Sequence, residues 1–223
     1  MFLYYITDRT QLSDNSETAT RMLLDRITAA ASAGIDAIQI REKDLPTRDL
    51  VNLSTKAAEI VRRENSLKSG KCVTRLLVNS RADVVVASGA DGVHLRSDDI
   101  PPAEARSMFM QACVSQPVIA ISCHTIREIE LAEGWGADFA VFGPVFEKSG
   151  QPAPSGLTAL RRACHRRAAK PAMPVLALGG VSLASAAECI AAGAAGIAGI
   201  RLFQCGNVGE TITRLRDTEK HPR

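Results

Sequence analysis

The sequence predicts one closed barrel of eight parallel strands, each followed by a helix, the (β/α)8 or TIM barrel. Three observations predict it: short apolar runs alternate with amphipathic stretches, a glycine-led motif returns before every second run, and 223 residues hold little more than eight such units. A doubly wound open sheet is the alternative, but no Gly-x-Gly-x-x-Gly follows the first run. We assign the barrel to residues 1–216 and a polar C-terminal tail to residues 217–223.

The apolar runs are short and mostly continuous, which is typical of parallel strands covered on both faces. The predicted strands are Leu3–Thr7, Ala37–Arg41, Arg75–Asn79, Gly92–Leu95, Val118–Ser122, Phe139–Phe142, Val175–Leu178 and Ile197–Ile200. Between the strands, apolar residues recur at helical spacing. The clearest cases are Ala19, Leu23, Ile27 and Ala30, and then Leu50, Leu53, Ala57 and Val61.

The predicted helices carry recognisable start and stop signals. Pro46 suits the first turn of a helix, and Thr125 with Glu128 and Asn207 with Glu210 have the spacing of N-terminal caps. A glycine that ends a helix in the left-handed conformation precedes the second, fourth, sixth and eighth strands. These glycines are Gly34, Gly89, Gly136 and Gly193.

Composition excludes several classes of function. A net charge of +3 and 4% aromatic residues argue against nucleic-acid binding and suit a small anionic ligand. No apolar run approaches the roughly 18 residues of a membrane span, and the N-terminal run lacks the basic residues of a signal peptide. The six scattered cysteines are interpreted as buried, reduced thiols of a cytoplasmic protein. A homo-oligomer remains open.

Polar side chains at the second strand end point to an anion site, because barrel active sites lie at the carboxyl ends of the strands. Gln39, Arg41 and Lys43 alternate along the chain and so share one face. If the intervening isoleucines pack on the helices, this trio faces the barrel mouth and forms a cradle for a polyanion. The alternative is that both cations are solvated or paired with Glu42 and Asp44.

The third and fourth strand ends each admit two interpretations. Asn79 can contact a ligand or cap the next helix. Asp98 and Asp99, beside Arg96, can hold Mg²⁺ or cap the helix that follows.

The remaining strand ends add a serine and glycine-rich turns. Ser122 is followed closely by His124, but no Gly-x-Ser-x-Gly motif supports a hydrolase. Gly179 and Gly180 follow the seventh strand and Ile200 ends the eighth, where backbone amides of such barrels commonly bind phosphate.

Two histidines receive structural interpretations. His94 ends an apolar strand and is interpreted as a satisfied core or packing histidine rather than a ligand. His165 lies in a run that we interpret as a solvated basic face, with Arg161, Arg162, Arg166 and Arg167.

Taken together, these motifs resemble the thiamine phosphate synthases and their close relatives, the thiazole tautomerases. The resemblance spans nearly the whole chain in the family's order. It is carried by Tyr5-Ile6-Thr7-Asp8-Arg9, Gln39-Ile40-Arg41-Glu42-Lys43-Asp44, Asn79 with Arg81 and Asp83, Gly89-Ala90-Asp91-Gly92-Val93-His94-Leu95, Ser122-Cys123-His124-Thr125, Gly143-Pro144-Val145-Phe146 and Ala177-Leu178-Gly179-Gly180-Val181.

The resemblance implies a transferase that joins hydroxymethylpyrimidine pyrophosphate and thiazole phosphate. Pyrophosphate leaves first, and the thiazole nitrogen captures the pyrimidinylmethyl cation. By matching position, Gln39, Arg41 and Lys43 contact the pyrimidine substrate, and the two cations grip its pyrophosphate. Asn79 joins them, and Ser122 contacts the pyrophosphate or the pyrimidine.

The resemblance also implies a metal and a second anion site. Asp99 matches a magnesium ligand of the family. Gly180 and Ile200, with Gly179 beside the first, match the backbone groups that hold the thiazole phosphate. The partners are thus small phosphorylated molecules, with neither nucleic acid nor membrane.

The chain departs from the family pattern at several positions. Ser80 stands where a second acidic magnesium ligand is usual, the loop of residues 147–155 is altered, and Arg201 replaces a serine. We therefore expect weak or absent Mg²⁺ binding. Arg96, Lys148 and Arg201 add positive charge that partly replaces the metal.

These departures leave two alternatives. The first is a tautomerase-like isomerase, in which His124 or Cys123 serves as the acid–base group, since the histidine usual near Pro144 is missing. The second is a non-catalytic barrel that binds thiamine precursors.

Overall fold

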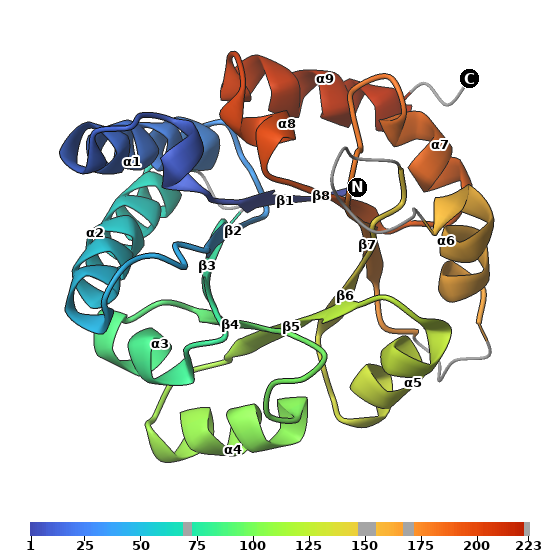
Figure 1. The fold of residues 1–223 in the computed structure, drawn as a ribbon, viewed down its shortest axis with the longest axis horizontal. Coiled ribbons are helices and arrows are strands. Elements are labelled where there is room, and N and C mark those ends of the chain that lie inside the picture. The colour runs from blue at the N-terminus through green and yellow to red at the C-terminus, as the bar shows by residue number, and fades with distance from the viewer. Residues whose placement is uncertain (69–72, 147–154, 167–171, 221–223) are drawn as a thin grey trace.

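The protein folds into a closed barrel of eight parallel strands in sequential order, β1 to β8, with β8 pairing back onto β1. The computed structural model describes residues 1–68, 73–146, 155–166 and 172–220. Figure 1 looks into the barrel and shows the strands at the centre with the helices around them. The predicted fold class is confirmed.

The strands lie where the apolar runs predict them. Their bounds are β1 Phe2–Ile6, β2 Ala37–Ile40, β3 Arg75–Asn79, β4 Gly92–Leu95, β5 Val118–Cys123, β6 Phe139–Phe142, β7 Val175–Ala177 and β8 Gly196–Gly199. Three strands have the predicted bounds, and no bound of the other five differs by more than one residue, which is the usual spread of strand ends.

A short 3-10 helix, η1 (Arg9–Gln11), follows β1, and α-helices cover the barrel. The helices are α1 Ser16–Ser32, α2 Thr47–Ser66, α3 Ala82–Ser88, α4 Pro102–Gln111, α5 Ile126–Gly134, α6 Gly156–Cys164, α7 Ala186–Ala191, α8 Arg201–Gln204 and α9 Val208–Lys220. Helix α9 thus continues past Asp217, where the tail was expected to begin. The division of the chain at residue 216 stays a prediction.

The core has two layers because side chains alternate along each strand. The outer layer lies between strands and helices and includes the predicted apolar faces of α1 and α2. The inner layer fills the barrel and is a smaller cluster. Its buried members are Tyr4, Ile6, Ala37, Leu77, Ala120, Phe139, Val141, Leu176 and Ala198.

The helix-terminal signals act as predicted. Thr125 and Glu128 form a reciprocal capping box at α5, and Asn207 Oδ1 accepts the Glu210 N–H at 3.2 Å. Pro46 precedes α2 as its N-cap rather than lying inside the first turn. The four repeated glycines all have positive φ, from +68° to +98°.

A carboxylate follows three of the repeated glycines and ties neighbouring strands together. Oδ2 of Asp36 accepts the Leu3 N–H at 2.6 Å, and Oδ2 of Asp91 accepts the Leu76 N–H at 2.7 Å. The Asp138 carboxylate holds the start of β5 in the same way. These bonds link β1 to β2, β3 to β4 and β5 to β6. The fourth repeat has Ala195 at this position, which has no carboxylate and links β7 to β8 through its backbone N–H to the Val175 carbonyl oxygen.

The cysteines and the hydropathy of the helices bear on the remaining expectations. The described cysteines are free thiols, but Cys113 and Cys205 are exposed and Cys164 is half-buried, so the prediction that all are buried holds only for Cys123 and Cys189 among them. Cys72 lies outside the described residues.

No helix in the described ranges combines the length and hydropathy that crossing a bilayer requires.

Candidate active site

The inward-facing polar side chains meet at the carboxyl end of the barrel. Ile38 and Ile40 pack in the outer core layer, so Gln39 between them turns into the barrel, where it is 1% exposed. Its Nε2 donates to Oδ1 of Asn79 on β3 at 2.9 Å. Ser122 faces the same interior from β5, through a bond to His94. The alternation along the strands therefore brings these groups to one mouth.

The two acidic neighbours of Arg41 and Lys43 are engaged elsewhere. Glu42 is buried and accepts hydrogen bonds from the Thr7 hydroxyl and from the backbone N–H of Arg9. The interpretation that Glu42 and Asp44 neutralise the two cations is therefore wrong in the described part of the chain. Asp44 instead accepts from the guanidinium of Arg9, at 2.8 Å.

Thr7 is a positioning residue that sequence reasoning passed over. Its hydroxyl donates to Glu42 and accepts the backbone N–H of Arg41 at 3.0 Å, so the end of β1 fixes the start of the loop after β2. The signal available in the sequence was the polar residue directly after the first apolar run, at the strand end that faces the mouth.

Three cations lie close together at this mouth. The pKa of Lys43 is lowered below its ordinary value, chiefly by the positive charge of Arg41, then by partial burial and by the charge of Arg96. Arg96 comes from the loop after β4, so two loops contribute to one positive region. Arg41 is half-buried, whereas Lys43 and Arg96 are exposed, so the alternative of a solvated cation holds for Lys43. A surface with three neighbouring cations favours a multiply charged anion over a singly charged one.

A hydrogen-bonded chain links Asn79 to Asp99 through the serine that departs from the family pattern. Asn79 Nδ2 donates to Oγ of Ser80 at 3.1 Å, and the Ser80 hydroxyl donates to Oδ2 of Asp99 at 2.6 Å. Arg96 donates to the same carboxylate from its backbone N–H, at 2.7 Å, and from Nε to Oδ1, at 3.4 Å. Asp99 therefore already accepts three donors.

The residues around Asp99 fit only a weak magnesium site. No group of three His, Cys, Asp or Glu side chains gathers to hold a metal ion in the ranges that the structure describes. Mg²⁺ prefers oxygen ligands and often takes several from substrate phosphates and water. Asp99 offers one carboxylate, and the Arg96 charge beside it opposes a cation.

The glycine-rich turns lie on the other side of the ring. In a closed order of eight strands, β7 and β8 stand opposite β3 and β4. Gly179 and Gly180 have φ of +94° and +66°, and a Cβ at Gly179 would lie 2.6 Å from the Pro144 Cα. Only glycine fits there without displacing the neighbouring loop. Ile200 connects β8 to α8 beside this turn.

His94 is a satisfied core histidine, as predicted, and its partners lie in the barrel interior. It is 2% exposed, and its ring nitrogens bond the Tyr4 hydroxyl at 3.0 Å and Oγ of Ser122 at 2.8 Å. Burial, with a smaller effect of the nearby Arg41 charge, lowers the pKa of His94 to about 3. The ring is therefore neutral at physiological pH. The parity of the strands places His94 inward, and that was the signal available in the sequence.

This depressed pKa predicts a pH dependence of stability. Between pH 6.5 and pH 3 the unfolded chain binds a proton at His94 that the folded protein does not bind. The stability contributed by neutral His94 is complete above pH 6.5 and is lost as the pH falls. From pH 7 to pH 5 we expect this group to lower the free energy of unfolding by about 2 kcal/mol, and His94→Gln to remove that loss.

Urea unfolding of wild type and His94→Gln at the two pH values measures the difference. The matched control is His165→Gln, since His165 is exposed and this variant should keep the wild-type pH dependence. Equal pH dependence in wild type and His94→Gln would contradict a neutral buried ring.

The structure also separates the two residues considered for acid–base chemistry. Cys123 packs in the outer core layer, and burial raises the pKa of its thiol to about 12, so the expectation that it serves at the mouth is wrong. His124 is exposed and bonds the Gly143 carbonyl oxygen through Nδ1 at 2.6 Å. Lys148 lies outside the described residues.

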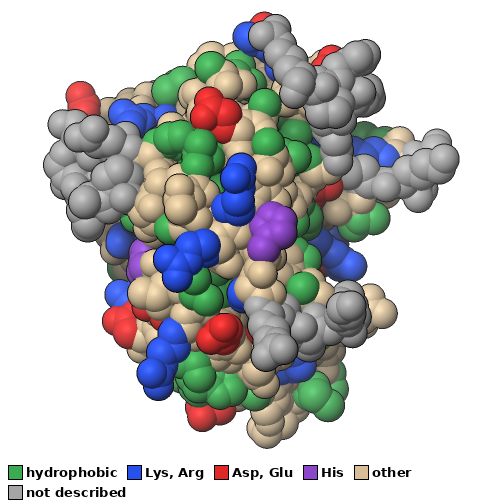
Figure 2. Space-filling model, turned by 90° about the vertical axis from the view of Figure 1, so that its right-hand side faces the viewer, with side chains coloured by type: hydrophobic (Ala, Val, Ile, Leu, Met, Phe, Trp, Pro, Cys, Tyr) green, Lys and Arg blue, Asp and Glu red, His purple; other side chains and the backbone are tan. Residues whose placement is uncertain are grey.

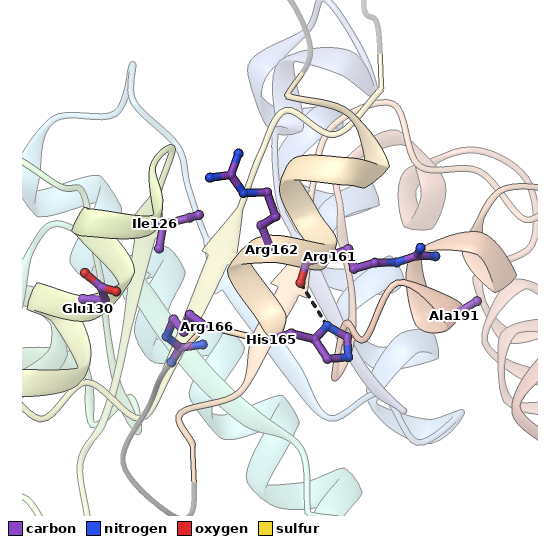
Figure 3. A pocket seen from close by; sticks show the side chains of 7 residues that line it. All are labelled: Ile126, Glu130, Arg161, Arg162, His165, Arg166 and Ala191. Carbon is purple, nitrogen blue, oxygen red and sulfur yellow. Dashed lines mark hydrogen bonds between the residues drawn. The ribbon is translucent and has the colours of Figure 1, made fainter.

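A basic surface depression lies away from the barrel mouth, between α5, α6 and α7. Figure 2 faces this side and shows Lys and Arg side chains near a histidine; Figure 3 labels Arg161, Arg162 and His165. The Nδ1 atom of His165 bonds the Arg161 carbonyl oxygen. Arg166 is 2% exposed and pairs with Glu133 at 3.0 Å, so a solvated face is the wrong description for this residue. Arg167 lies outside the described residues.

Comparison with known proteins identifies similar sequences and structures. The family model described as thiamine monophosphate synthase matches residues 3–203. A putative thiamine-phosphate synthase of Geobacter sulfurreducens is 38% identical over 202 residues, covering 88% of this chain and 83% of the relative. A thiamine-phosphate synthase of Methanoculleus marisnigri is 35% identical over 219 residues, covering 96% and 93%.

A solved structure agrees with the sequence matches. The thiamine phosphate pyrophosphorylase from Pyrococcus furiosus superposes with a TM-score of 0.77 at 27% identity, covering 98% of this chain and 95% of that chain. The similarity therefore extends over the whole barrel, including all the strand ends described above.

Proposed function

The chain belongs to the thiamine monophosphate synthase family and is a transferase of thiamine biosynthesis, and we propose that the mouth of its barrel is where the reaction takes place. The reaction joins hydroxymethylpyrimidine pyrophosphate to thiazole phosphate and releases pyrophosphate. One observation carries the site assignment. Arg41, Lys43 and Arg96 gather at the mouth, and the acidic neighbours of the first two bond Thr7 and Arg9 instead.

The pyrimidine ring binds over Gln39 and Asn79. The carbonyl oxygen of Gln39 is buried and has no hydrogen-bond partner among the described residues, so it can accept from a ring amino group. The Asn79 amide is held by Gln39 on one side and Ser80 on the other. A fixed polar floor of this kind orients the ring for loss of its substituent.

Arg41 and Lys43 grip the pyrophosphate, and Ser122 and Arg96 contribute a hydrogen bond and a further charge. As the bond between the methylene carbon and the pyrophosphate oxygen breaks, negative charge grows on the leaving group. Cations that are already in place stabilise this charge without reorganisation. The electron-deficient methylene carbon is then captured by the thiazole nitrogen.

The thiazole phosphate occupies the opposite side of the mouth. The backbone of Gly179, Gly180 and Ile200 supplies its N–H donors, as expected for turns after the seventh and eighth strands. This places the thiazole nitrogen across the cavity from the pyrimidine seat. Contact of Lys148 with the pyrophosphate remains a prediction. The assignment of residues 1–216 as the catalytic domain also remains a prediction.

Asp99 is the residue that would hold Mg²⁺, which when bound adds positive charge beside the pyrophosphate. Arg96 already places a fixed cation at this position, and Ser80 offers a hydroxyl in place of a second carboxylate. We infer that the fixed cations carry part of the charge neutralisation that a metal would supply.

This inference predicts a limited effect of metal removal. With EDTA in excess, wild type should retain turnover within about tenfold of its rate in Mg²⁺, because Arg96 remains in place. Arg96→Ala should lower the rate and make it strongly dependent on added Mg²⁺. Steady-state rates of both proteins with and without EDTA measure this. Complete loss of wild-type activity on chelation, with Arg96→Ala active in Mg²⁺, would reject it.

The direct test of function mixes the purified protein with both substrates and follows thiamine phosphate. Formation of thiamine phosphate and pyrophosphate in equal amounts supports the proposal. Tautomerised thiazole phosphate without coupling would select the isomerase, and binding without turnover would select the precursor-binding barrel. We propose that the protein acts in the cytoplasm and that its ligands are small phosphorylated molecules. A homo-oligomer is compatible with this proposal.

A further inference from the structure

A line of hydrogen bonds crosses the barrel interior beneath the mouth. It runs from the Tyr4 hydroxyl on β1 to Nδ1 of His94 on β4, 3.0 Å, and from Nε2 of His94 to Oγ of Ser122 on β5, 2.8 Å. Tyr4 is fully buried, and its ring lies in the apolar inner core layer, edge-on to Phe139 at 5.3 Å and stacked on the His94 ring at 5.7 Å.

The chemistry of the buried end fixes the direction of this line. Burial raises the pKa of Tyr4 and lowers that of His94, so the phenol and the imidazole are both neutral, and the imidazole carries a single N–H. Among the described residues, Nδ1 of His94 is the hydrogen-bond partner that the Tyr4 hydroxyl has. If Nδ1 carried the proton, the phenol hydrogen would be buried without an acceptor, which costs about 1–3 kcal/mol.

The favoured arrangement therefore has Tyr4 donating to Nδ1 and the Nε2–H donating to Ser122. The Ser122 oxygen then accepts one hydrogen bond from below, and its own hydrogen is left to point toward the mouth. A serine hydroxyl without this partner rotates among its staggered positions and can equally accept a hydrogen bond.

We propose that Tyr4 and His94 are positioning residues that hold the Ser122 hydroxyl as a hydrogen-bond donor to the departing pyrophosphate. This rests on the proposed function, in which Ser122 contacts the pyrophosphate side of the pyrimidine substrate. A donor that is oriented before the reaction stabilises the developing charge without first having to rotate.

Kinetics of single and double variants test the coupling. Ser122→Ala should lower kcat about 100-fold, and Tyr4→Phe roughly tenfold, with KM for both substrates changed less than about twofold. Because Tyr4 acts only through Ser122, the double variant should turn over at the Ser122→Ala rate. The matched control is Tyr5→Phe. The Tyr5 hydroxyl is buried on the next residue of the same strand, faces the outer layer and has no hydrogen-bond partner among the described residues, so the rate should not change.

Nuclear magnetic resonance tests the proton direction independently of turnover. With ¹⁵N-labelled histidine, wild type should show His94 as the Nε2–H tautomer at neutral pH. An Nδ1–H tautomer, an unchanged rate in Tyr4→Phe, or independent effects of Tyr4→Phe and Ser122→Ala would each overturn the positioning role. Absence of thiamine phosphate formation by wild type would instead contradict the proposed function.

Discussion

Arg41→Ala is expected to lower kcat/KM for the pyrimidine substrate by roughly 100- to 1,000-fold, the range found when one preorganised charge-stabilising group is removed. Arg41 is the centre of the positive region, because its charge lowers the pKa of both Lys43 and His94. Its backbone is fixed by Thr7, so no other described cation can take its position without moving the loop after β2.

The control for Arg41 is an arginine of equal charge away from the mouth. Arg214 on α9 is 60% exposed and has only a long contact, 3.9 Å, to Glu210. Arg214→Ala should leave kcat/KM within about twofold, since exposed ion pairs contribute little. Steady-state kinetics of both variants measure kcat/KM, and equal values for the two would contradict the proposed pyrophosphate-binding site.

Gly92→Ala is expected to destabilise the protein by about 3 kcal/mol, through a clash that the backbone must relieve. A Cβ at Gly92 would lie 1.8 Å from the carbonyl oxygen of Val118 on the neighbouring strand. Since β4 and β5 are hydrogen-bonded neighbours in the closed ring, separating them disturbs the hydrogen bonds of their register. We expect the midpoint of thermal unfolding to fall by about 6–12 °C.

Gly134→Ala is the matched control for Gly92→Ala. Gly134 ends α5, has an ordinary φ, and a Cβ there meets nothing within 4 Å. Alanine should stabilise the helix by about 0.5–1 kcal/mol. Calorimetry or denaturant unfolding distinguishes the two variants, and a Gly92→Ala protein as stable as wild type would contradict the close strand contact.

The fold was predictable because its determinants are local. Continuous apolar runs identify buried parallel strands, and Gly34, Gly89, Gly136 and Gly193 mark where helices end, which their positive φ values confirm. The predicted boundaries differ from the observed ones by one residue at the ends of five strands, because side-chain patterns do not fix where backbone pairing stops. The end of β2 illustrates this: Arg41 was expected in the strand, but its backbone turns to meet Thr7.

The site was predictable only where the alternation of side chains along a strand decides which residues face the barrel interior. Parity placed Gln39 in the barrel interior and brought Asn79 to it. It could not show that Glu42 turns toward Thr7, because Glu42 lies beyond the end of β2, where the alternation of a strand no longer fixes the direction of a side chain. It also could not identify the partners of His94, since Tyr4 and Ser122 lie far away in the chain.

Local patterns failed in a similar way on the outer surface. The run around His165 reads as a solvated basic face, yet Arg166 is buried against Glu133 of the preceding helix. A single buried ion pair between helices leaves no trace in residue spacing. Nor does composition reveal which scattered thiols reach the surface, as Cys113 and Cys205 do.

The carboxylates of Asp36, Asp91 and Asp138 each add a side-chain hydrogen bond to one pair of neighbouring strands, and one of the four odd–even pairs lacks such a bond. Each carboxylate hydrogen-bonds the backbone of an odd-numbered strand and so links it to the even-numbered strand that follows. At the fourth pair Ala195 offers no such group, and β7 and β8 are joined by backbone hydrogen bonds. The β7–β8 pair leads into the turns at Gly180 and Ile200. The segment assigned to the second substrate thus lacks the carboxylate-to-backbone bond that the other three odd–even strand pairs have, including the pair on the cationic side opposite.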